Sequence, residues 1–219
     1  NYWFKKNSIK ATYEKKKISN SDLENLILEV REKKIHGVNI TVPFKKDIIS
    51  HLDNLTLEAD KTQSVNTIYL SNNKIVGHNT DIEGFQNSIK NINYNLSGKK
   101  IFILGAGGVV PSIIFALNKM KVSSITISNR TRLKAEKLKN LFKNLTVIDW
   151  GEITNFDMII NATSLGLKVN DQINLDFSKV GNNKFFYDVI YNPSETKFLK
   201  EGKILGNKTE NGKMMFIYQ

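Results

Sequence analysis

Residues 99–110 read KKIFILGAGGVV, and this stretch decides the fold. The apolar run 101–104 ends at Gly105, and Gly107 and Gly108 follow at once. A short apolar run bounded by glycine is typical of a buried strand in a parallel sheet. Glycines directly after such a strand let the backbone turn tightly and let its N–H groups approach a pyrophosphate at the start of the next helix. Because a tight structural turn also needs glycines, the loop by itself leaves both interpretations open.

The segments after this loop alternate between helix and strand patterns. Helices are predicted at 109–120 and 132–142, and strands at 123–129, 145–149, 157–162 and 184–190. Strands that alternate with helices indicate a parallel sheet covered on both faces. Val110 stands where a third small residue is usual, so we expect either looser helix packing there or a local adjustment.

The part of the chain before the loop predicts a second α/β unit. Its elements are a helix at 21–30 opened by a capping box of Ser21 and Glu24, a strand at 38–42, a helix after Pro43, a hairpin around 71–74 and a helix after Asp81. The chain is therefore predicted to be an α/β protein of two domains, with the boundary near 81–98.

The residues after the second strand of the glycine-loop unit indicate which dinucleotide it binds. An NAD site normally has Asp or Glu about 20 residues after the glycines, to hold the ribose hydroxyls. No acidic residue lies between Gly108 and Glu136, and the strand ends instead in NRTRLK (129–134). A guanidinium at Arg130 can grip a 2′-phosphate by paired hydrogen bonds. We therefore predict NADP(H), with Arg132 and Lys134 adding positive charge or, for Arg132, lying on a solvated helix start.

Composition narrows the function classes. The 219 residues include no cysteine, which excludes disulfides and thiolate metal sites and suits a cytoplasmic location. The three histidines share no ligand spacing, so no metal is expected. No apolar run approaches the roughly 20 residues of a membrane span, and no secretory signal is visible. The net charge of +11 fits nucleic-acid binding or a lysine-rich surface. We favour the second, because basic residues are spread along the chain.

Eight motifs occur in the order and spacing of the shikimate dehydrogenase family, which the chain resembles along essentially its whole length. They are GVNITVPFK (37–45), SVNTI (64–68), GHNTD (77–81), GAGG (105–108), NRT (129–131), NATSLG (161–166), YDVIYNP (187–193) and NGKMMFIYQ (211–219). The resemblance implies a substrate-binding catalytic domain at 1–82 with 213–219, and a Rossmann NADP domain at 83–212. It also implies the reversible NADPH-dependent reduction of 3-dehydroshikimate to shikimate, a step of aromatic amino acid (chorismate) biosynthesis.

The resemblance assigns roles residue by residue. Lys45 matches the catalytic lysine, and Asp81 matches its partner carboxylate, although Asp81 by its position is equally a helix N-cap. Lys46 is read as a solvated neighbour. The positions that match substrate contacts are Thr41, Asn66, Tyr191 and Gln219, with Asn39 as a neighbour that either contributes or holds the turn together. The positions expected at the cofactor are Gly105, Ala106, Gly107, Gly108, Val109, Asn129, Arg130, Thr131, Lys134, Val189 and Gly212, with Gly212 alternatively a plain turn glycine.

Some expectations remain open at the sequence level. The family's N-terminal strand and final helix are expected before Asn1 and after Gln219, so the chain is expected to be a trimmed form. The alternatives to an NADP-dependent enzyme are an NAD-preferring quinate/shikimate dehydrogenase and a non-catalytic dinucleotide-binding fragment. We expect a small-molecule substrate and neither nucleic acid nor membrane as a partner, with a homodimer as a candidate assembly. The aromatic residues Tyr2, Trp3 and Phe4 are expected in the core.

Overall fold

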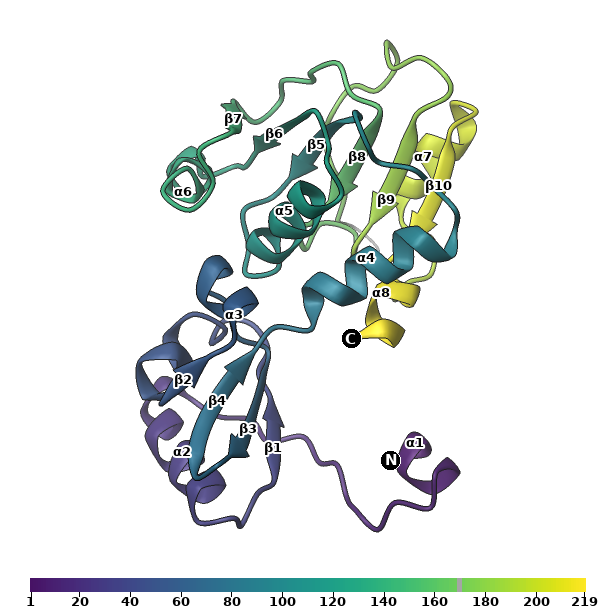
Figure 1. Ribbon diagram of the computed structural model, residues 1–219. Helices are drawn as coiled ribbons and strands as arrows, with labels where there is room; N and C mark the ends of the chain where they lie inside the picture. The colour runs from purple at the N-terminus through teal and green to yellow at the C-terminus, as the bar shows by residue number, and fades with distance from the viewer. Residues whose placement is uncertain (169–170) are drawn as a thin grey trace.

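The computed structural model describes residues 1–168 and 171–219, without the side chain of Trp3. Two lobes are built around two separate β-sheets, and the long helix α4 runs from one to the other (Figure 1). The helices are α1 (Tyr2–Lys6), η1 (Asn20–Asp22), α2 (Leu23–Arg31), η2 (Asp47–His51), α3 (Leu57–Thr62), α4 (Asp81–Asn91), α5 (Val110–Lys119), α6 (Arg132–Leu138), α7 (Lys197–Ile204) and α8 (Lys213–Tyr218). The strands are β1 (Gly37–Asn39), β2 (Asn54–Leu55), β3 (Thr67–Ser71), β4 (Lys74–His78), β5 (Lys100–Leu104), β6 (Ser124–Ser128), β7 (Leu145–Ile148), β8 (Met158–Asn161), β9 (Phe185–Asp188) and β10 (Lys208–Asn211).

The first sheet is small and mixed, in the order β1-β3-β4-β2. β3 pairs antiparallel with both β1 and β4, whereas β2 is parallel to β4. Asn72 and Asn73, at the predicted hairpin, both have positive φ (50° and 58°), which is the conformation that a tight two-residue hairpin needs. The apolar side of α2 packs on this sheet through residues such as Leu23, Ile27 and Val30.

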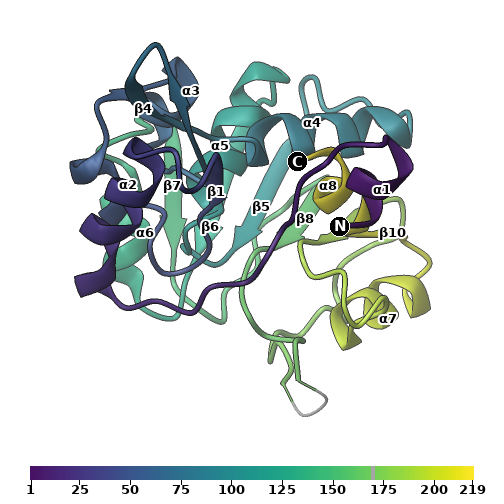
Figure 2. The same cartoon turned by 90° about the horizontal axis from the view of Figure 1, so that it is seen from below.

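The second sheet has six parallel strands in the order β10-β9-β8-β5-β6-β7. Successive residues of β5 point to opposite faces, so Ile101 and Ile103 join one core while Phe102 and Leu104 join another. The first core is covered by α4, α5, α6 and Met215 of α8, and the second by α7 and the segment that includes Phe177. Figure 2 shows α4 and α5 on one side of this sheet and α7 on the other. The α/β fold with a parallel sheet covered on both faces is confirmed.

Several local predictions are wrong. The strand predicted at 38–42 ends at Asn39, because the chain turns after the N–H of Ile40 bonds the carbonyl of Asn66, and Val42 is 71% exposed. The helix predicted after Pro43 is present, as the 3-10 helix η2, and Ile48 in it is buried. Helix α2 begins at Leu23, and the capping interaction before it joins Ser19 N to Asp22 Oδ2 (2.7 Å) instead of using Ser21 and Glu24.

The expected burial of the N-terminal aromatic residues is also wrong where it can be checked. Tyr2 is 69% exposed, since α1 projects away from both sheets (Figure 1). Phe4 is partly buried but belongs to none of the core clusters of the described residues. The side chain of Trp3 lies outside the described structure. Val110, in contrast, is the first residue of α5 and is fully buried in the core. Valine is therefore accommodated at the position where a smaller residue is usual.

Candidate active site between the two lobes

Lys45 and Asp81 form an ion pair at the junction of the lobes. Lys45 lies in the turn between β1 and η2, and Asp81 is the first residue of α4. The lysine Nζ is 2.6 Å from Asp81 Oδ2, and the two side chains are 13% and 2% exposed. An ion pair so shielded from solvent is held much more rigidly than a surface pair, because water neither screens nor replaces it.

Asn66 fixes the orientation of the Asp81 carboxylate. Its Nδ2 donates to Asp81 Oδ1 (2.9 Å), while its Oδ1 accepts from the Thr80 N–H (2.9 Å). The N-cap of α4 is Thr80, and Asp81 is the first helical residue. The carboxylate of Asp81 therefore faces Lys45 and Asn66, and its alternative interpretation as an N-cap is wrong.

The glycine loop meets this pair from the other lobe. Gly105 has φ +108°, and a Cβ there would lie 2.8 Å from the carbonyl oxygen of Ala162. Glycine is thus required at this position both by backbone conformation and by the close approach of β8. A Cβ on Gly108 would lie 3.8 Å from Cδ of Lys45, so the stem of the lysine rests against the loop.

The loop after β6 is tied to the glycine loop and leaves two basic side chains available. Ala106 N donates to Asn129 Oδ1 (3.1 Å), and Asn129 Nδ2 donates to the Thr131 carbonyl (2.8 Å). Arg132 is occupied by Asp149, at 2.6 Å. Arg130 and Lys134 are exposed, and within the described residues neither forms an ion pair. Of the basic residues in the segment 129–134, these two are therefore the ones that no described ion pair occupies and that can receive a phosphate.

The remaining predicted cofactor positions stand at the same edge of the sheet. Val109 precedes α5, Val189 follows β9 and Gly212 follows β10, so all lie beyond the carboxyl ends of parallel strands. In open α/β sheets, ligands bind at this edge, where the strand order reverses, which is between β5 and β8 here. Gly212 has ordinary φ (−74°), but a Cβ there would lie 2.0 Å from the Val189 carbonyl oxygen. Glycine is therefore required here by the close approach of the Val189 backbone and not by a left-handed turn conformation.

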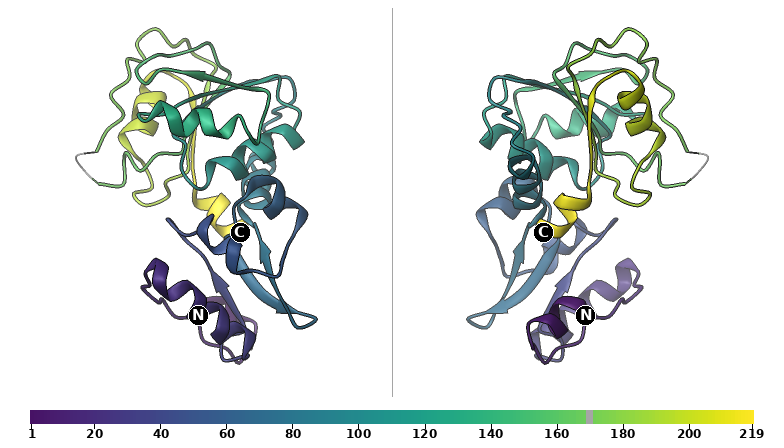
Figure 3. Two further views of the ribbon diagram at one scale, coloured as in Figure 1. Left: turned by 90° about the vertical axis from the view of Figure 1, so that its left-hand side faces the viewer. Right: turned by 90° about the vertical axis from the view of Figure 1, so that its right-hand side faces the viewer.

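The other three predicted substrate positions are Gln219, Tyr191 and Thr41. Gly84 lies one turn after Asp81 on α4, and a Cβ on it would touch Gln219 Cγ at 3.0 Å, which places Gln219 on the helix face that carries Asp81. Figure 3 shows the C-terminus where the lobes meet. Tyr191 is 45% exposed and stacks on Phe216 of α8, with ring centroids 4.7 Å apart. Thr41 is exposed, and its carbonyl accepts from Phe44 N in the turn before Lys45.

Asn39 is held by structural contacts. Its amide donates to Thr67 Oγ1 (3.2 Å) on β3, and its Oδ1 accepts from the Tyr13 hydroxyl (3.0 Å). These contacts favour the alternative in which Asn39 holds the turn together.

Sequence reasoning missed a buried carboxylate at the end of β9, beside the loop that follows β8. Asp188 is fully buried and accepts hydrogen bonds from Asn161 Nδ2, Ile190 N and Thr196 Oγ1 (3.0, 3.0 and 2.6 Å). Burial raises the pKa of Asp188 to about 6, although these hydrogen bonds oppose the rise. Asp188 thereby joins the loop after β8 to the loop that carries Tyr191. The only sequence signal was an acid at the end of an otherwise apolar strand.

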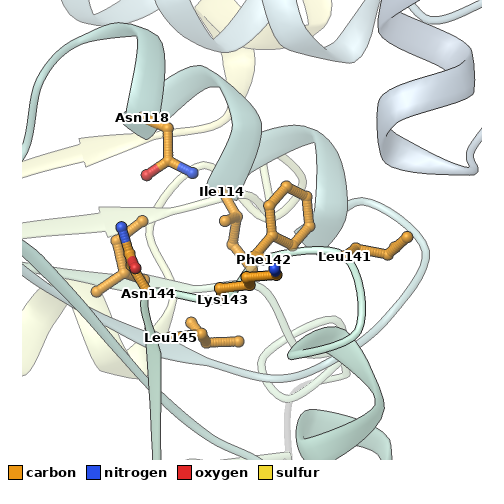
Figure 4. Close-up of a pocket in the computed structure, with 8 residues that line it drawn as sticks. Ile114, Asn118, Leu141, Phe142, Lys143, Asn144 and Leu145 are labelled. Carbon is orange, nitrogen blue, oxygen red and sulfur yellow. The ribbon is translucent and has the colours of Figure 1, made fainter.

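The structure also has a hollow that contains none of the predicted site residues. It lies between α5 and the segment that follows α6, and Figure 4 shows its lining of Ile114, Asn118, Leu141, Phe142, Lys143, Asn144 and Leu145. No described group of His, Cys, Asp and Glu side chains could hold a metal ion. Among the described helices, none has the length and apolarity needed to cross a membrane.

Comparison with known proteins covers most of the chain. The family described as "Shikimate dehydrogenase substrate binding domain" matches residues 1–68, and "Shikimate / quinate 5-dehydrogenase" matches residues 87–190. A curated shikimate dehydrogenase (NADP(+)) from Pelagibacter ubique is 59% identical over 100% of this chain and 83% of its own length.

Solved structures give the same result. Shikimate dehydrogenase from Aquifex aeolicus superimposes with a TM-score of 0.91 at 34% identity, over 99% of this chain and 80% of that one. Shikimate 5-dehydrogenase from Thermus thermophilus, solved with NADP(H) and shikimate, has a TM-score of 0.88 at 28% identity, over 98% and 81% of the two chains. With both lobes matched by family and the full length aligned to a curated enzyme, the chain belongs to the shikimate dehydrogenase family.

Proposed function

We propose that this protein catalyses the reversible, NADPH-dependent reduction of 3-dehydroshikimate to shikimate in aromatic amino acid biosynthesis. The observation that carries the proposal is the shielded pair of Lys45 and Asp81, 2.6 Å apart, with the lysine stem against the glycine loop at Gly108. In this proposal Lys45 is the proton donor, and its position against the glycine loop supports a reaction that joins the two lobes. Hydride transfer to a ketone needs both at the same carbonyl group.

The residues at the edge of the parallel sheet fit NADP(H). The loop 105–108 lacks side chains beyond one methyl, and it opens the ten-residue helix α5, whose N-terminal dipole favours a pyrophosphate. Arg130 and Lys134 suit a 2′-phosphate, and no acid at the end of β6 would repel it. When bound, NADPH supplies the hydride that reduces the ketone.

The protein's own residues supply the proton and the orientation. A lysine ammonium stabilises the negative charge that grows on the carbonyl oxygen, and it can then donate the proton that completes the hydroxyl. We assign this role to Lys45. Asp81, oriented by Asn66, would hold the ammonium in place and accept a hydrogen bond from a substrate hydroxyl. In the oxidation of shikimate, Lys45 would take the proton back.

In this proposal one lobe binds the substrate and the other binds the cofactor. We propose that residues 1–82 with 213–219 bind the substrate and that residues 83–212 bind the cofactor, with Thr41, Tyr191 and Gln219 offering polar groups to substrate hydroxyls. Each buried hydroxyl left unpaired would cost about 1–3 kcal/mol. We further propose a cytoplasmic location, no nucleic-acid partner and a homodimer as the candidate assembly. Sedimentation of the purified protein tests the last point.

The test is turnover of shikimate with NADP by the full-length protein, followed at the nicotinamide absorbance band. Lys45→Ala should lower kcat by about 10²–10⁴-fold, the usual contribution of a positioned acid or base. Lys46→Ala is the matched control, because the neighbouring lysine is exposed, and it should keep the wild-type rate. A wild-type protein without turnover, or a fully active Lys45→Ala variant, would reject the proposal.

A further inference from the structure

One buried amide connects the catalytic lobe to the cofactor lobe. Asn79 is fully buried just before α4. Its Oδ1 accepts from the Asp81 N–H (3.0 Å), and its Nδ2 donates to Ser112 Oγ (2.9 Å) on α5 and to the Ser64 carbonyl (2.8 Å). The same side chain therefore holds the backbone of Asp81 and the first turn of the helix that the glycine loop opens.

A second connection runs in parallel to the first. Ser64, 2% exposed, donates its hydroxyl to the Gly108 carbonyl (3.1 Å) in the glycine loop. The next residue, Val65, donates its N–H to the Lys45 carbonyl (2.8 Å). Short paths of hydrogen bonds thus connect Lys45 and Asp81 to the cofactor lobe, through Val65 and Ser64 for the lysine and through Asn79 for the aspartate.

We infer that Asn79 and Ser64, through Ser112 and Gly108, are positioning residues that set the distance between the proton donor and the hydride source. The inference rests on the proposed function, and it explains why these polar groups are buried. A buried amide that only stabilised its own lobe could be satisfied by partners within that lobe. Asn79 instead donates one of its hydrogen bonds to Ser112 in the other lobe. Misplacement of reacting groups by about 1 Å can cost roughly 10²-fold in rate.

The exposed contact between the lobes provides the contrast. Lys119, in the last turn of α5, pairs with Glu58 of α3 at 3.2 Å, with side chains 46% and 28% exposed. Solvent screens such a pair, which contributes little. The two contacts join the same helix to the same lobe, but only the buried one lies beside the glycine loop.

The experiment compares Ser112→Ala with two controls. Ser112→Ala leaves Asn79 Nδ2 bonded to the Ser64 carbonyl, so the buried amide keeps a partner and the variant should fold. We expect kcat to fall at least tenfold while KM for shikimate and Kd for NADP stay within twofold. The first control, Lys119→Ala, removes the exposed contact between the lobes. The second, Ser88→Ala, removes a serine hydroxyl that is also fully buried but lies on α4 and bonds within the cofactor lobe. Both controls should keep kcat within twofold of the wild-type value.

Hydrogen exchange of the peptide covering 105–115 gives a readout independent of turnover. Ser112→Ala should speed this exchange at least fivefold, and the two control variants should not. An unchanged kcat in Ser112→Ala, or an equal loss in Ser88→Ala, overturns the inference. If the wild-type protein itself lacks turnover, the proposed function fails, and the exchange data alone then decide whether the connection between the lobes exists.

Discussion

Replacement of Gly212 by alanine should move the C-terminal part of the site. Gly212 faces Val189 across the ends of the neighbouring parallel strands β10 and β9. The alanine Cβ would lie 2.0 Å from the Val189 carbonyl oxygen, and backbone atoms cannot rotate away as a side chain can. The start of α8 and the loop that leads to Tyr191 must therefore separate.

The size of the movement follows from the contact distance. Ordinary van der Waals contact begins at 3.4 Å, so the two backbones must separate by about 1.4 Å. Overpacking of this kind costs about 1–3 kcal/mol, which lowers Tm by roughly 2–4 °C per kcal/mol for a chain of this size. Because Phe216 of α8 stacks on Tyr191 at 4.7 Å, and α8 also carries Gln219 toward α4, the shift reaches the substrate side of the site. Misplacement of this order predicts a loss of about 10²-fold in kcat/KM.

The assay is the shikimate–NADP reaction at a temperature well below the Tm of each variant. Gly181→Ala is the matched control, since a Cβ there meets nothing within 4 Å and its φ lies outside the left-handed region. It should change neither Tm nor kcat/KM measurably. If Gly212→Ala retains wild-type kcat/KM, then the approach of α8 to the loop after β9 does not position the site, and the reasoning is refuted.

Three further predictions concern single charges. Arg130→Ala should raise KM for NADP at least tenfold and change KM for NAD little, because the guanidinium has a partner only in a 2′-phosphate; equal losses in steady-state kinetics with both cofactors would contradict this. Asp81→Asn should lower the free energy of unfolding in urea by about 3–5 kcal/mol, because it leaves the ammonium of Lys45 shielded and unpaired, and adding Lys45→Met should restore part of the loss; a double variant as unstable as the sum of the single ones would show that the pair is not coupled. Burial raises the pKa of Asp188 from 3.8 to about 6, so the folded protein keeps a proton that the unfolded chain has lost between these values. The contribution of Asp188 to the free energy of unfolding is therefore fully present below pH 3.8 and is lost as the pH rises through 6. The free energy of unfolding should fall by roughly 3 kcal/mol over this window. Asp188→Asn should flatten the free energy of unfolding over this window, and parallel urea-derived curves for the two proteins would argue against it.

Elements with a strong local signal were predictable. The glycines after β5 and the two asparagines of the hairpin are residue types that adopt positive φ readily, so they marked turns. The alternation of strands with helices was visible in the apolar pattern. The choice of NADP over NAD also came from local chemistry, since Arg130 stands where an acid is usual. Strand β10 was missed because it is a polar edge strand, KTEN, in which no apolar period is visible.

The end of β1 illustrates why local patterns fail at boundaries. Val42 continues the alternation of Val38 and Ile40, yet it is exposed, because the last ladder contact is made by Ile40 with Asn66 and the chain then turns toward Lys45. A pattern of apolar residues records which side chains can be buried, but it does not record where a partner strand stops.

The sequence by itself determined the parallel sheet, the site of the dinucleotide loop and, through its resemblance to a family, which lysine and which acid to examine. Only the tertiary structure decided that Lys45 and Asp81 meet at 2.6 Å, that Gly212 is required by the Val189 backbone, and that Asn79 connects the lobes. The physical reason is the range of the interactions. Backbone conformation and amphipathic periodicity are set by residues a few positions apart, whereas an ion pair or a close backbone contact joins residues 23 to 36 positions apart. Their meeting depends on the packing of every element between them.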